Sequence, residues 1–343
     1  MIVYIPQNID PYNTHLKNLV EAYNSKGIEI IVGYDFFLGN ILPDIIHFHF
    51  LEGILKHIKY NEIEFFNRLD AYKEKGVVFL LTMHDLRPHA KVKQFDYPTL
   101  FRKFLHYVNL FIHHGENSIE ILKREFPVLS GKARHIVCHH GDYLNDMRIF
   151  NQTQEEARIA LKLPLKKKII LIFGQLQFKN TSFAEEVFGL LSNKYSDAIL
   201  LMAGVKPIFR YNRINKIYYK INNTCFNFFR TNKVLIHNRF SQLETYQLFM
   251  ASDMIFLPHK SGLTSGLIPM AATLGKPFVY PNIGVFEEQA EYCFAQKYES
   301  NNKNEAFNAI QDILSSGVQS FDNSKWLENN NWEKHVEHIF SNL

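Results

Sequence analysis

The chain has 343 residues, of which 46% are hydrophobic and 21% are charged, and its formal net charge at pH 7 is +4. With 30 Phe and 17 Tyr available for packing, this composition excludes a disordered chain, and we expect no nucleic-acid partner. Because a single hydrophobic core usually stops growing at about 250 to 300 residues, the length predicts two domains.

The cysteines and the apolar runs bear on the cellular compartment. The three cysteines, Cys138, Cys225 and Cys293, are far apart and odd in number, so they indicate neither a disulfide framework nor a zinc knuckle. The N-terminal stretch MIVYIPQNIDPYN lacks the charged start and long apolar region of a signal peptide. No apolar run approaches the roughly 18 residues of a membrane-spanning helix. We therefore expect a cytoplasmic protein.

Short apolar runs alternate with longer helical patterns along the chain, which is typical of parallel sheets built from βαβ units. The segment 15–27 is predicted to be a helix, because its apolar residues recur at helical spacing and Gly27 suits a left-handed stop. In the first half we predict strands at residues 1–6, 28–35, 45–50, 77–85, 110–115 and 135–140.

The polar stretch 141–167, which contains QTQEEARIALKLPLKKK, is predicted to link two domains. A second αβ series follows it, with strands predicted at residues 168–174, 198–204, 234–240, 254–259, 278–282 and 293–298. The predicted fold class is therefore α/β, with two doubly wound, Rossmann-like domains that face a cleft. The expected domains are residues 1–150, residues 151–325 and a terminal helix within residues 326–343.

The stretch KSGLTSGLIPMAATLGKPFV, residues 260–279, follows a predicted strand and opens a helix without any acidic residue. The first turn of a helix leaves amide hydrogens without partners, and glycine lets the backbone approach phosphate oxygens closely. Such a loop can bind an anion; its hydroxyls can equally well cap the helix. The candidate residues are Ser261, Gly262, Thr264, Ser265 and Gly266.

A second loop, in IILIFGQLQFKN, places Gly174 at the end of a strand and Lys179 five residues later. In a two-sheet protein we expect this loop to lie next to the loop at 260–266, where the lysine can neutralise a diphosphate. The alternative is a lysine that is simply exposed at the surface.

These stretches resemble those of glycosyltransferases with two Rossmann-like domains, the GT-B type, especially a large bacterial group, mostly retaining, that uses nucleotide sugars. The resemblance is strongest over residues 168–288 and includes the Gly-Lys-Pro that follows the loop and helix. It implies a terminal helix, here WEKHVEHIF, that crosses back to the first domain. It also implies donor-binding residues, which we place at Gly174, Gln177, Lys179, Asn238, Glu244 and the loop at 261–266.

Two departures from this family concern the donor site. The usual pair of glutamates would fall near Gly262 and Met270, and neither position is acidic. Gln177 stands where the family often has arginine, so Lys179 would carry more of the charge stabilisation. The loop instead resembles polysaccharide-assembly transferases with Ser-x-x-Thr-Ser-Gly here. For Glu244, a contact with the nucleotide and a role at a helix N-terminus are both open.

In the first domain, LLTMHDLRPH resembles the family segment that ends a strand with Thr-x-His-Asp. The resemblance implies that His84 contacts the sugar or assists the reaction, with His89 as the second choice and Asp85 as a possible base in an inverting enzyme. A buried structural histidine and a turn-capping aspartate are the alternatives.

Further histidines lie at the ends of predicted strands. His47 and His49 share one face of a strand, a spacing that can bind metal. Without a cysteine or carboxylate partner nearby, we predict no metal site there and no cofactor. The pairs 113–114 and 139–140 are placed near the cleft.

The segment KVKQFDYPTLFRKFLHYVNLF, residues 91–111, mixes basic and aromatic residues at partly helical spacing. It can rest on an anionic membrane at the inner face of the cell membrane, near a lipid-linked acceptor; buried aromatic residues with solvated lysines explain the pattern as well.

The sequence thus predicts a metal-independent glycosyltransferase of the hexosyltransferase kind. It would move a sugar from a nucleotide-sugar donor to a glycan or lipid-linked acceptor in bacterial surface-polysaccharide assembly. The alternatives are a nucleotide-sugar 2-epimerase of the same architecture, a catalytically inactive nucleotide-sugar binding protein and, last, a metal-dependent hydrolase.

Overall fold

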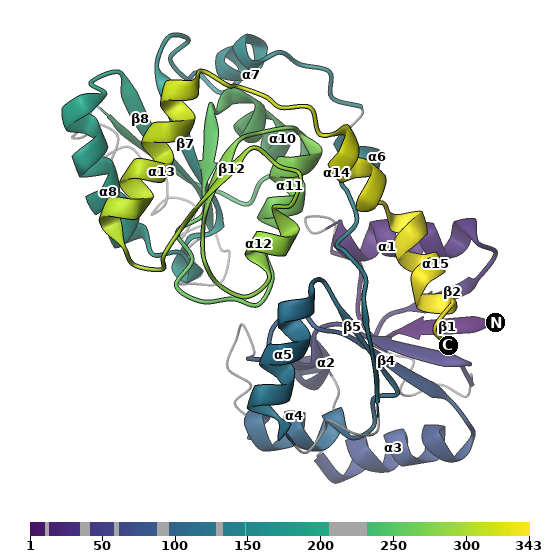
Figure 1. The fold of residues 1–343 in the computed structure, drawn as a ribbon. Coiled ribbons are helices and arrows are strands. Elements are labelled where there is room, and N and C mark those ends of the chain that lie inside the picture. Colours follow the sequence, from purple (N-terminus) through teal and green to yellow (C-terminus); the bar gives the residue numbers. More distant parts are fainter. Residues whose placement is uncertain are drawn as a thin grey trace, which may run out of the picture. The chain divides into compact units, whose positions relative to one another are not determined.

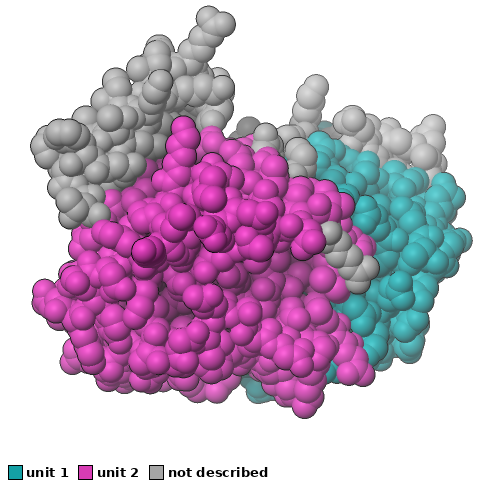
Figure 2. Space-filling view, turned by 90° about the horizontal axis from the view of Figure 1, so that it is seen from above, with its two compact units in different colours: residues 1–141, 329–343 teal, residues 142–328 magenta. Residues whose placement is uncertain are grey.

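The computed structural model describes most of the chain, and the chain divides into two compact units. Unit 1 comprises residues 1–141 and 329–343, and unit 2 comprises residues 142–328 (Figure 2). The sequence placed the two boundaries at 150/151 and 325/326. The described residues are 1–10, 14–34, 42–57, 62–87, 96–127, 133–147, 149–205 and 232–343.

Unit 1 is built on a parallel sheet of six strands in the order β2-β1-β3-β4-β5-β6 (Figure 1). The order reverses between β1 and β3, which lie side by side although β2 separates them in the chain. In open α/β sheets, such a switch point is where ligands bind, beyond the carboxyl ends of the strands. The strands are β1 (Ile2–Ile5), β2 (Glu29–Val32), β3 (Ile45–Phe48), β4 (Val78–Thr82), β5 (Leu110–His113) and β6 (Arg134–Val137).

The helices of unit 1 bury one apolar stripe each against this sheet. On one face, Val3 and Ile5 of β1 pack with Leu19 and Tyr23 of the first helix and with Ile339 near the C-terminus. The helices are α1 (His15–Ser25), α2 (Leu51–His57), α3 (Glu62–Glu74), α4 (Tyr97–Leu105), α5 (Glu116–Glu125) and α15 (Trp332–Phe340).

The C-terminal helix α15 belongs to unit 1 and lies beside α1, as the resemblance implied (Figure 1). Trp332 and Val336 are buried in the same cluster as the strands. At the surface, the Lys26 Nζ lies 2.6 Å from a Glu337 carboxylate oxygen. The return of the chain end to the first domain is therefore confirmed.

Unit 2 contains a second parallel sheet of six strands in the order β12-β11-β10-β7-β8-β9. Counted within the unit, this is the order 3-2-1-4-5-6 of dinucleotide-binding Rossmann domains, read from β9 to β12. Its switch point lies between β7 and β10. The strands are β7 (Lys168–Gln175), β8 (Ala198–Val205), β9 (Lys233–His237), β10 (Met254–Phe256), β11 (Phe278–Pro281) and β12 (Ala295–Tyr298).

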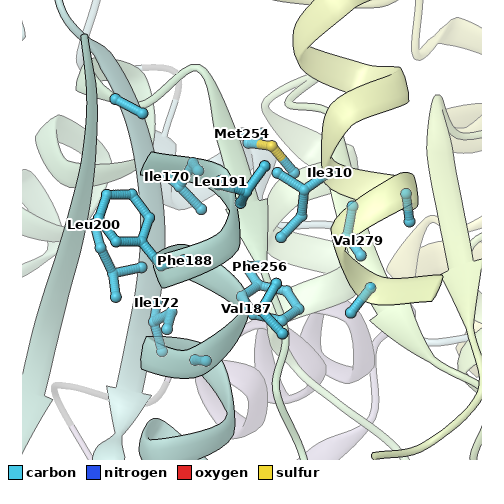
Figure 3. Packing of buried hydrophobic residues seen from close by; sticks show 14 of the residues in the cluster. Ile170, Ile172, Val187, Phe188, Leu191, Leu200, Met254, Phe256, Val279 and Ile310 are labelled. Carbon is cyan, nitrogen blue, oxygen red and sulfur yellow. The ribbon is translucent and has the colours of Figure 1, made fainter. Parts of the chain in front are cut away.

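Helices cover both faces of the second sheet, because alternate strand residues point to opposite sides. Ile170 and Ile172 pack with Val187 and Ile310 from α8 and α13 (Figure 3), whereas Leu171 packs on the other face with α10 and α11. The helical elements are α6 (Leu144–Met147), α7 (Gln154–Ala160), the 3₁₀ turn η3 (Leu176–Phe178), α8 (Thr181–Lys194), α10 (Gln242–Ala251), α11 (Leu267–Thr273), α12 (Phe286–Gln289), α13 (Lys303–Ser316) and α14 (Ser324–Asn329).

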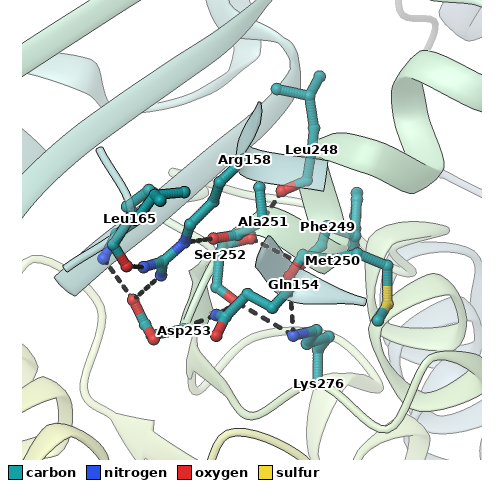
Figure 4. Close-up of polar contacts among 11 residues, drawn as sticks. Gln154, Arg158, Leu165, Leu248, Phe249, Met250, Ala251, Ser252, Asp253 and Lys276 are labelled. Carbon is teal, nitrogen blue, oxygen red and sulfur yellow. Dashed lines mark hydrogen bonds and ion pairs between the residues drawn. The ribbon is translucent and has the colours of Figure 1, made fainter. Parts of the chain in front are cut away.

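Two buried cations complete the C-terminal end of α10 (Figure 4). Lys276 donates to the carbonyl oxygens of Met250 and Ser252, each at 3.1 Å. Arg158 donates to the Ala251 carbonyl at 2.8 Å and to Asp253 Oδ2 at 2.8 Å. The last carbonyls of a helix have no intrahelical partner, so these side chains satisfy them. The lysine of the Gly-Lys-Pro motif is therefore structural.

The predicted α/β fold with two doubly wound sheets is confirmed, and each predicted strand segment overlaps an observed strand. In the basic, aromatic segment, residues 91–95 lie outside the described part, and the aromatic side chains of α4 are buried. The sequence left open whether this segment contacts a membrane or packs its aromatic residues in the core. In the described helix α4, the aromatic residues are buried in the protein. Among the described helices, none has the length and apolarity to cross a membrane.

Candidate functional site

The two loops that the sequence singled out meet in unit 2. They follow β7 and β10, which are hydrogen-bonded neighbours at the switch point of the sheet. Gly174, near the end of β7, has φ 102°, a backbone conformation that favours glycine. A Cβ on its register partner Gly204 would overlap the Gly174 carbonyl, so the two glycines let β7 and β8 end in close contact.

Lys179 pairs with a histidine that the sequence analysis did not single out. An isolated antiparallel bridge joins Lys179 to His259, and the Lys179 Nζ is hydrogen-bonded to the His259 Nε2. Burial lowers the pKa of Lys179 to about 7. The pKa of His259 is lowered well below 6.5, mainly by burial and to a smaller extent by the nearby Lys179. Lys179 can therefore gain a proton when an anion arrives.

The loop at 261–266 keeps backbone donors exposed beside this pair. Gly266 is exposed and Gly262 is partly exposed. Within the described part of the chain, the amides of Gly262 and Gly266 donate no hydrogen bond to protein. Thr264 is partly exposed and Ser261 fully so. Two amides without a protein acceptor, on residues that are at least partly exposed, thus lie at the carboxyl edge of β10, where an anion can bind.

Neighbouring residues hold this loop in place. The Ser265 amide donates to the Gln289 side chain at 3.0 Å, and the Ser265 hydroxyl accepts from the Leu267 amide at 3.3 Å. Ser265 is buried and its hydroxyl stabilises the turn before α11, whereas the helix itself begins after Gly266 without a side-chain cap. At Gly284, φ is 52°, and a Cβ would overlap the carbonyl oxygens of Gly262 and Leu263. Only glycine allows this close approach.

The other predicted donor residues are more dispersed. Gln177 is exposed and donates to Gln175 at 3.3 Å. Asn238 follows β9, the edge strand two positions from β7. Glu244 lies in the first turn of α10, where its carboxylate accepts from the Ser241 amide at 2.8 Å in a capping box. The helix N-terminus role proposed as one alternative for Glu244 is thus observed.

In unit 1, His84 and Asp85 directly follow β4 and differ in exposure. His84 is 8% exposed, its Nε2 lies 3.1 Å from His49 Nδ1, and its ring stacks on Phe50. Asp85 is partly exposed and lines a small pocket that also includes Arg87. His89 lies outside the described residues. Exposure therefore favours Asp85 over His84 as a group that reaches a substrate.

His84 is one member of a buried histidine cluster at the carboxyl edge of the first sheet. The ring centroids of His47 and His49 lie 4.2 Å apart, but the two nitrogens of His47 contact Tyr23 and Thr82 at 2.9 and 2.8 Å and are not available to a shared ion. The cluster consists of His15, His49, His84, His114 and His140.

Burial keeps four of these five imidazoles neutral. It lowers the pKa of His114 to about 4 and that of His140 to about 3, and it lowers those of His15 and His49 well below 6.5. Between pH 5 and 8, these four side chains therefore offer lone pairs rather than charge.

Sequence reasoning missed His259, His15 and Gln289. His259 lies at the end of the predicted strand 254–259, just before the candidate loop, and this position was itself a usable signal. His15 was visible only as the start of a helix. Gln289 lies 24 residues beyond Ser265, so its contact depends on the tertiary fold.

Comparisons with known proteins bear on this architecture. No family model and no curated protein matches the sequence. Solved structures match across the whole chain at low identity. A sucrose-phosphate synthase from Thermosynechococcus elongatus has 14% identity and a TM-score of 0.72, over 99% of this chain and 97% of that one.

Two further structures were solved with ligands. Anabaena HepE in complex with UDP-glucose has 12% identity and a TM-score of 0.62, over 100% of this chain and 99% of that one. Starch synthase IV from Arabidopsis thaliana, bound to ADP and acarbose, has 11% identity and a TM-score of 0.69, over 99% and 98%. Together with the two parallel sheets and the returning helix, these likenesses show that the chain has the GT-B fold.

Proposed function

We propose that this protein is a glycosyltransferase that transfers a sugar from a nucleotide-sugar donor. One observation carries the proposal: Lys179, paired with His259, and the exposed amides of Gly262 and Gly266 follow two adjacent strands at the switch point of unit 2. Fixed donors at a switch point suit a phosphate ligand. The GT-B structures solved with UDP-glucose and with ADP support a nucleoside diphosphate as that ligand.

Departure of a nucleoside diphosphate builds negative charge on the β-phosphate, so donors already in place stabilise the transition state more than the ground state. The amides need little reorganisation, because Gln289 and Gly284 hold the loop. Lys179 supplies the charge. Its pKa of about 7 means that bound diphosphate favours the ammonium form and draws a proton to it. We propose that donor binding needs no metal ion.

Unit 1 would supply the acceptor site. Asp85 is the better candidate for a general base, because it is partly exposed and lines a pocket with Arg87. His84, predicted to contact the sugar, would act from a buried position. A glycan or lipid-linked acceptor in surface-polysaccharide assembly, at the inner face of the membrane, remains our proposal for the pathway.

Calorimetric titration with UDP and ADP tests the donor site. Lys179→Met should weaken binding of the preferred diphosphate about tenfold or more, since a charge-assisted contact contributes about 1.5 to 3 kcal/mol. Lys303→Met, which removes an exposed lysine on α13, should leave the affinity unchanged. In wild type, affinity should fall as pH rises above 7, with proton uptake on binding, and Mg²⁺ should have no effect. An unaltered affinity in Lys179→Met would remove Lys179 from the site.

Turnover separates this proposal from its alternatives. Incubation with UDP-sugars and a glycan acceptor mixture should yield a glycosylated product and free diphosphate. Nucleotide binding without sugar release would indicate an inactive binding protein. Conversion of the donor sugar to its C2 epimer, without transfer, would indicate an epimerase.

A further inference from the structure

The histidine cluster of unit 1 occupies the switch point of that sheet. His15 begins α1, which follows β1, and His49 directly follows β3, the strand beside β1. His84 follows β4, the next strand. All three side chains are buried. Three strands that are separate in the sequence thus bring three imidazoles to the position where open α/β sheets bind ligands.

The three imidazoles converge closely enough to share one ion. One nitrogen from each of His15, His49 and His84 lies within 4.8 Å of the other two. Their ring centroids are 4.9, 5.4 and 5.6 Å apart. With metal–nitrogen distances of about 2.0 to 2.1 Å, a tetrahedral ion separates its nitrogens by about 3.3 Å and the ring centroids by about 5 Å. The spacing requires only small side-chain shifts.

Hydrogen bonds set the tautomer of His15. The His140 Nδ1–H donates to the Gly141 carbonyl at 2.7 Å, so the neutral His140 ring has its lone pair on Nε2. That nitrogen lies 3.0 Å from His15 Nδ1, which must therefore donate to it. A neutral His15 then carries its lone pair on Nε2. A metal-binding histidine typically donates its second N–H to a partner in this way.

His114 and His49 each have a buried nitrogen without a hydrogen-bond partner among the described residues. His114 Nδ1 donates to the Cys138 carbonyl at 2.9 Å, which leaves a lone pair on Nε2; this atom and His49 Nε2 are buried without a hydrogen-bond partner. His49 Nδ1 and His84 Nε2 lie 3.1 Å apart, a distance that suits two lone pairs directed at one cation as well as a hydrogen bond. A neutral imidazole has one lone pair, so in the metal-bound arrangement His49 Nε2 carries the proton, and the unsatisfied lone pair that the ion explains is that of His114 Nε2. Buried polar atoms without partners are rare, and a bound ion is one explanation.

We propose that His15, His49 and His84 bind one divalent transition-metal ion of the Zn²⁺ class, with His114 beside them. The three ligand atoms are imidazole nitrogens, which suit Zn²⁺, Co²⁺, Ni²⁺ or Cu²⁺ and not Mg²⁺ or Ca²⁺. His140 positions His15, and Trp332, with its ring centroid 5.0 Å from that of His15, packs against the site. This site is independent of the donor site proposed for unit 2.

Titration of the full-length, tag-free protein with Co²⁺ tests the site. The expected result is one Co²⁺ per chain by elemental analysis, with the visible absorption of tetrahedral cobalt and an imidazole ligand set by X-ray absorption. His15→Gln, His49→Gln and His84→Gln should each weaken binding at least tenfold. Zn²⁺ at a hundredfold excess over its Kd should raise the melting temperature by roughly 5 °C or more.

The double variant His139→Gln, His338→Gln is the matched control, because both histidines are exposed. It should bind Co²⁺ as wild type does. Circular dichroism identifies any variant that fails to fold, and the wild-type X-ray absorption spectrum identifies the ligands without substitution. Substoichiometric binding by wild type, a spectrum without imidazole ligands, or loss of binding in the surface variant would each overturn the proposal. None of these readouts requires transfer activity, so they stand apart from the test of the proposed function.

Discussion

The two units share one architecture and differ in the chemistry at the switch point of the sheet. In unit 1, buried and neutral imidazoles fill this position, with His15 and His49 after adjacent strands. In unit 2, the corresponding position presents exposed backbone amides at Gly262 and Gly266 and a single amine at Lys179. The strand orders of the two sheets differ, but each has a switch point. Under our proposals, the switch point of unit 1 binds a transition-metal cation and that of unit 2 binds an anion. The order of the strands determines only where a ligand site lies on each sheet. The side chains at that position determine which kind of ligand it suits.

The largest expected difference between the two units is the loss of stability on acidification. Burial lowers the pKa of His113 and of His335 to about 3, and an unfolded histidine titrates near 6.5. Their stabilising contribution is therefore complete above pH 6.5 and is lost as the pH falls towards 3. Below pH 6.5, each of these histidines lowers the free energy of unfolding by about 1.4 kcal/mol per pH unit. Together, His113 and His335 should therefore destabilise unit 1 by about 5 kcal/mol at pH 4.5.

The stability of each unit can be followed by tryptophan fluorescence, because Trp332 is buried in unit 1 and Trp326 is buried in unit 2. In urea titrations at pH 7.5 and pH 5, Trp326→Phe reports unit 1 and Trp332→Phe reports unit 2. We expect the midpoint of unit 1 to fall further. Equal shifts in both variants would contradict the concentration of buried, neutral histidines in unit 1.

Removing a buried charge should weaken unit 2 selectively. Arg158→Met leaves the largely buried Asp253 without its ion-pair partner, although the Gln154 side chain and the Ile169 amide still donate to it. The loss of a buried ion-pair partner costs about 3 to 5 kcal/mol. Lys303→Met removes an exposed pair with Glu186 and should cost less than about 1 kcal/mol. Trp326 fluorescence in urea measures both. A small effect for Arg158→Met would mean that the network in Figure 4 contributes little.

The donor loop depends on a glycine beneath it. Gly284→Ala should weaken diphosphate binding about tenfold, because its Cβ would displace the carbonyls of Gly262 and Leu263. Gly317→Ala is the matched control: φ is 69° there too, but a Cβ meets no atom within 4 Å. It should cost about 1 kcal/mol of stability and leave the affinity unchanged. Equal affinities in the two variants would contradict a preformed loop.

Glu244 should show the smallest effect. Glu244→Gln weakens the capping box of α10 and should cost up to about 1 kcal/mol of stability without altering the diphosphate affinity. Glu156→Gln weakens the equivalent box of α7 in the same unit and provides the comparison. If Glu244→Gln alone bound the diphosphate more weakly, this result would support the predicted contact between Glu244 and the nucleotide.

The elements were more predictable than the contacts between them. Apolar runs with flanking turns located every strand in the described part of the chain, because period and length are local properties of the sequence. The pairing of Lys179 with His259 joins residues 80 positions apart and required the adjacency of β7 and β10. The expectation that His47 and His49 share one strand face was a local inference, and their ring centroids do lie 4.2 Å apart. The contacts of the His47 nitrogens with Tyr23 and Thr82 depend on the tertiary fold and could not be predicted locally.

The central claim is that the amides of Gly262 and Gly266, with Lys179, bind the diphosphate of the donor. Selective ¹⁵N labelling of the 16 glycines allows a direct test by NMR titration with the diphosphate that calorimetry identifies. We predict that the Gly262 and Gly266 amide signals shift with saturation, while that of Gly317 does not move. Saturation of the protein without a shift at Gly262 or Gly266 would contradict the account.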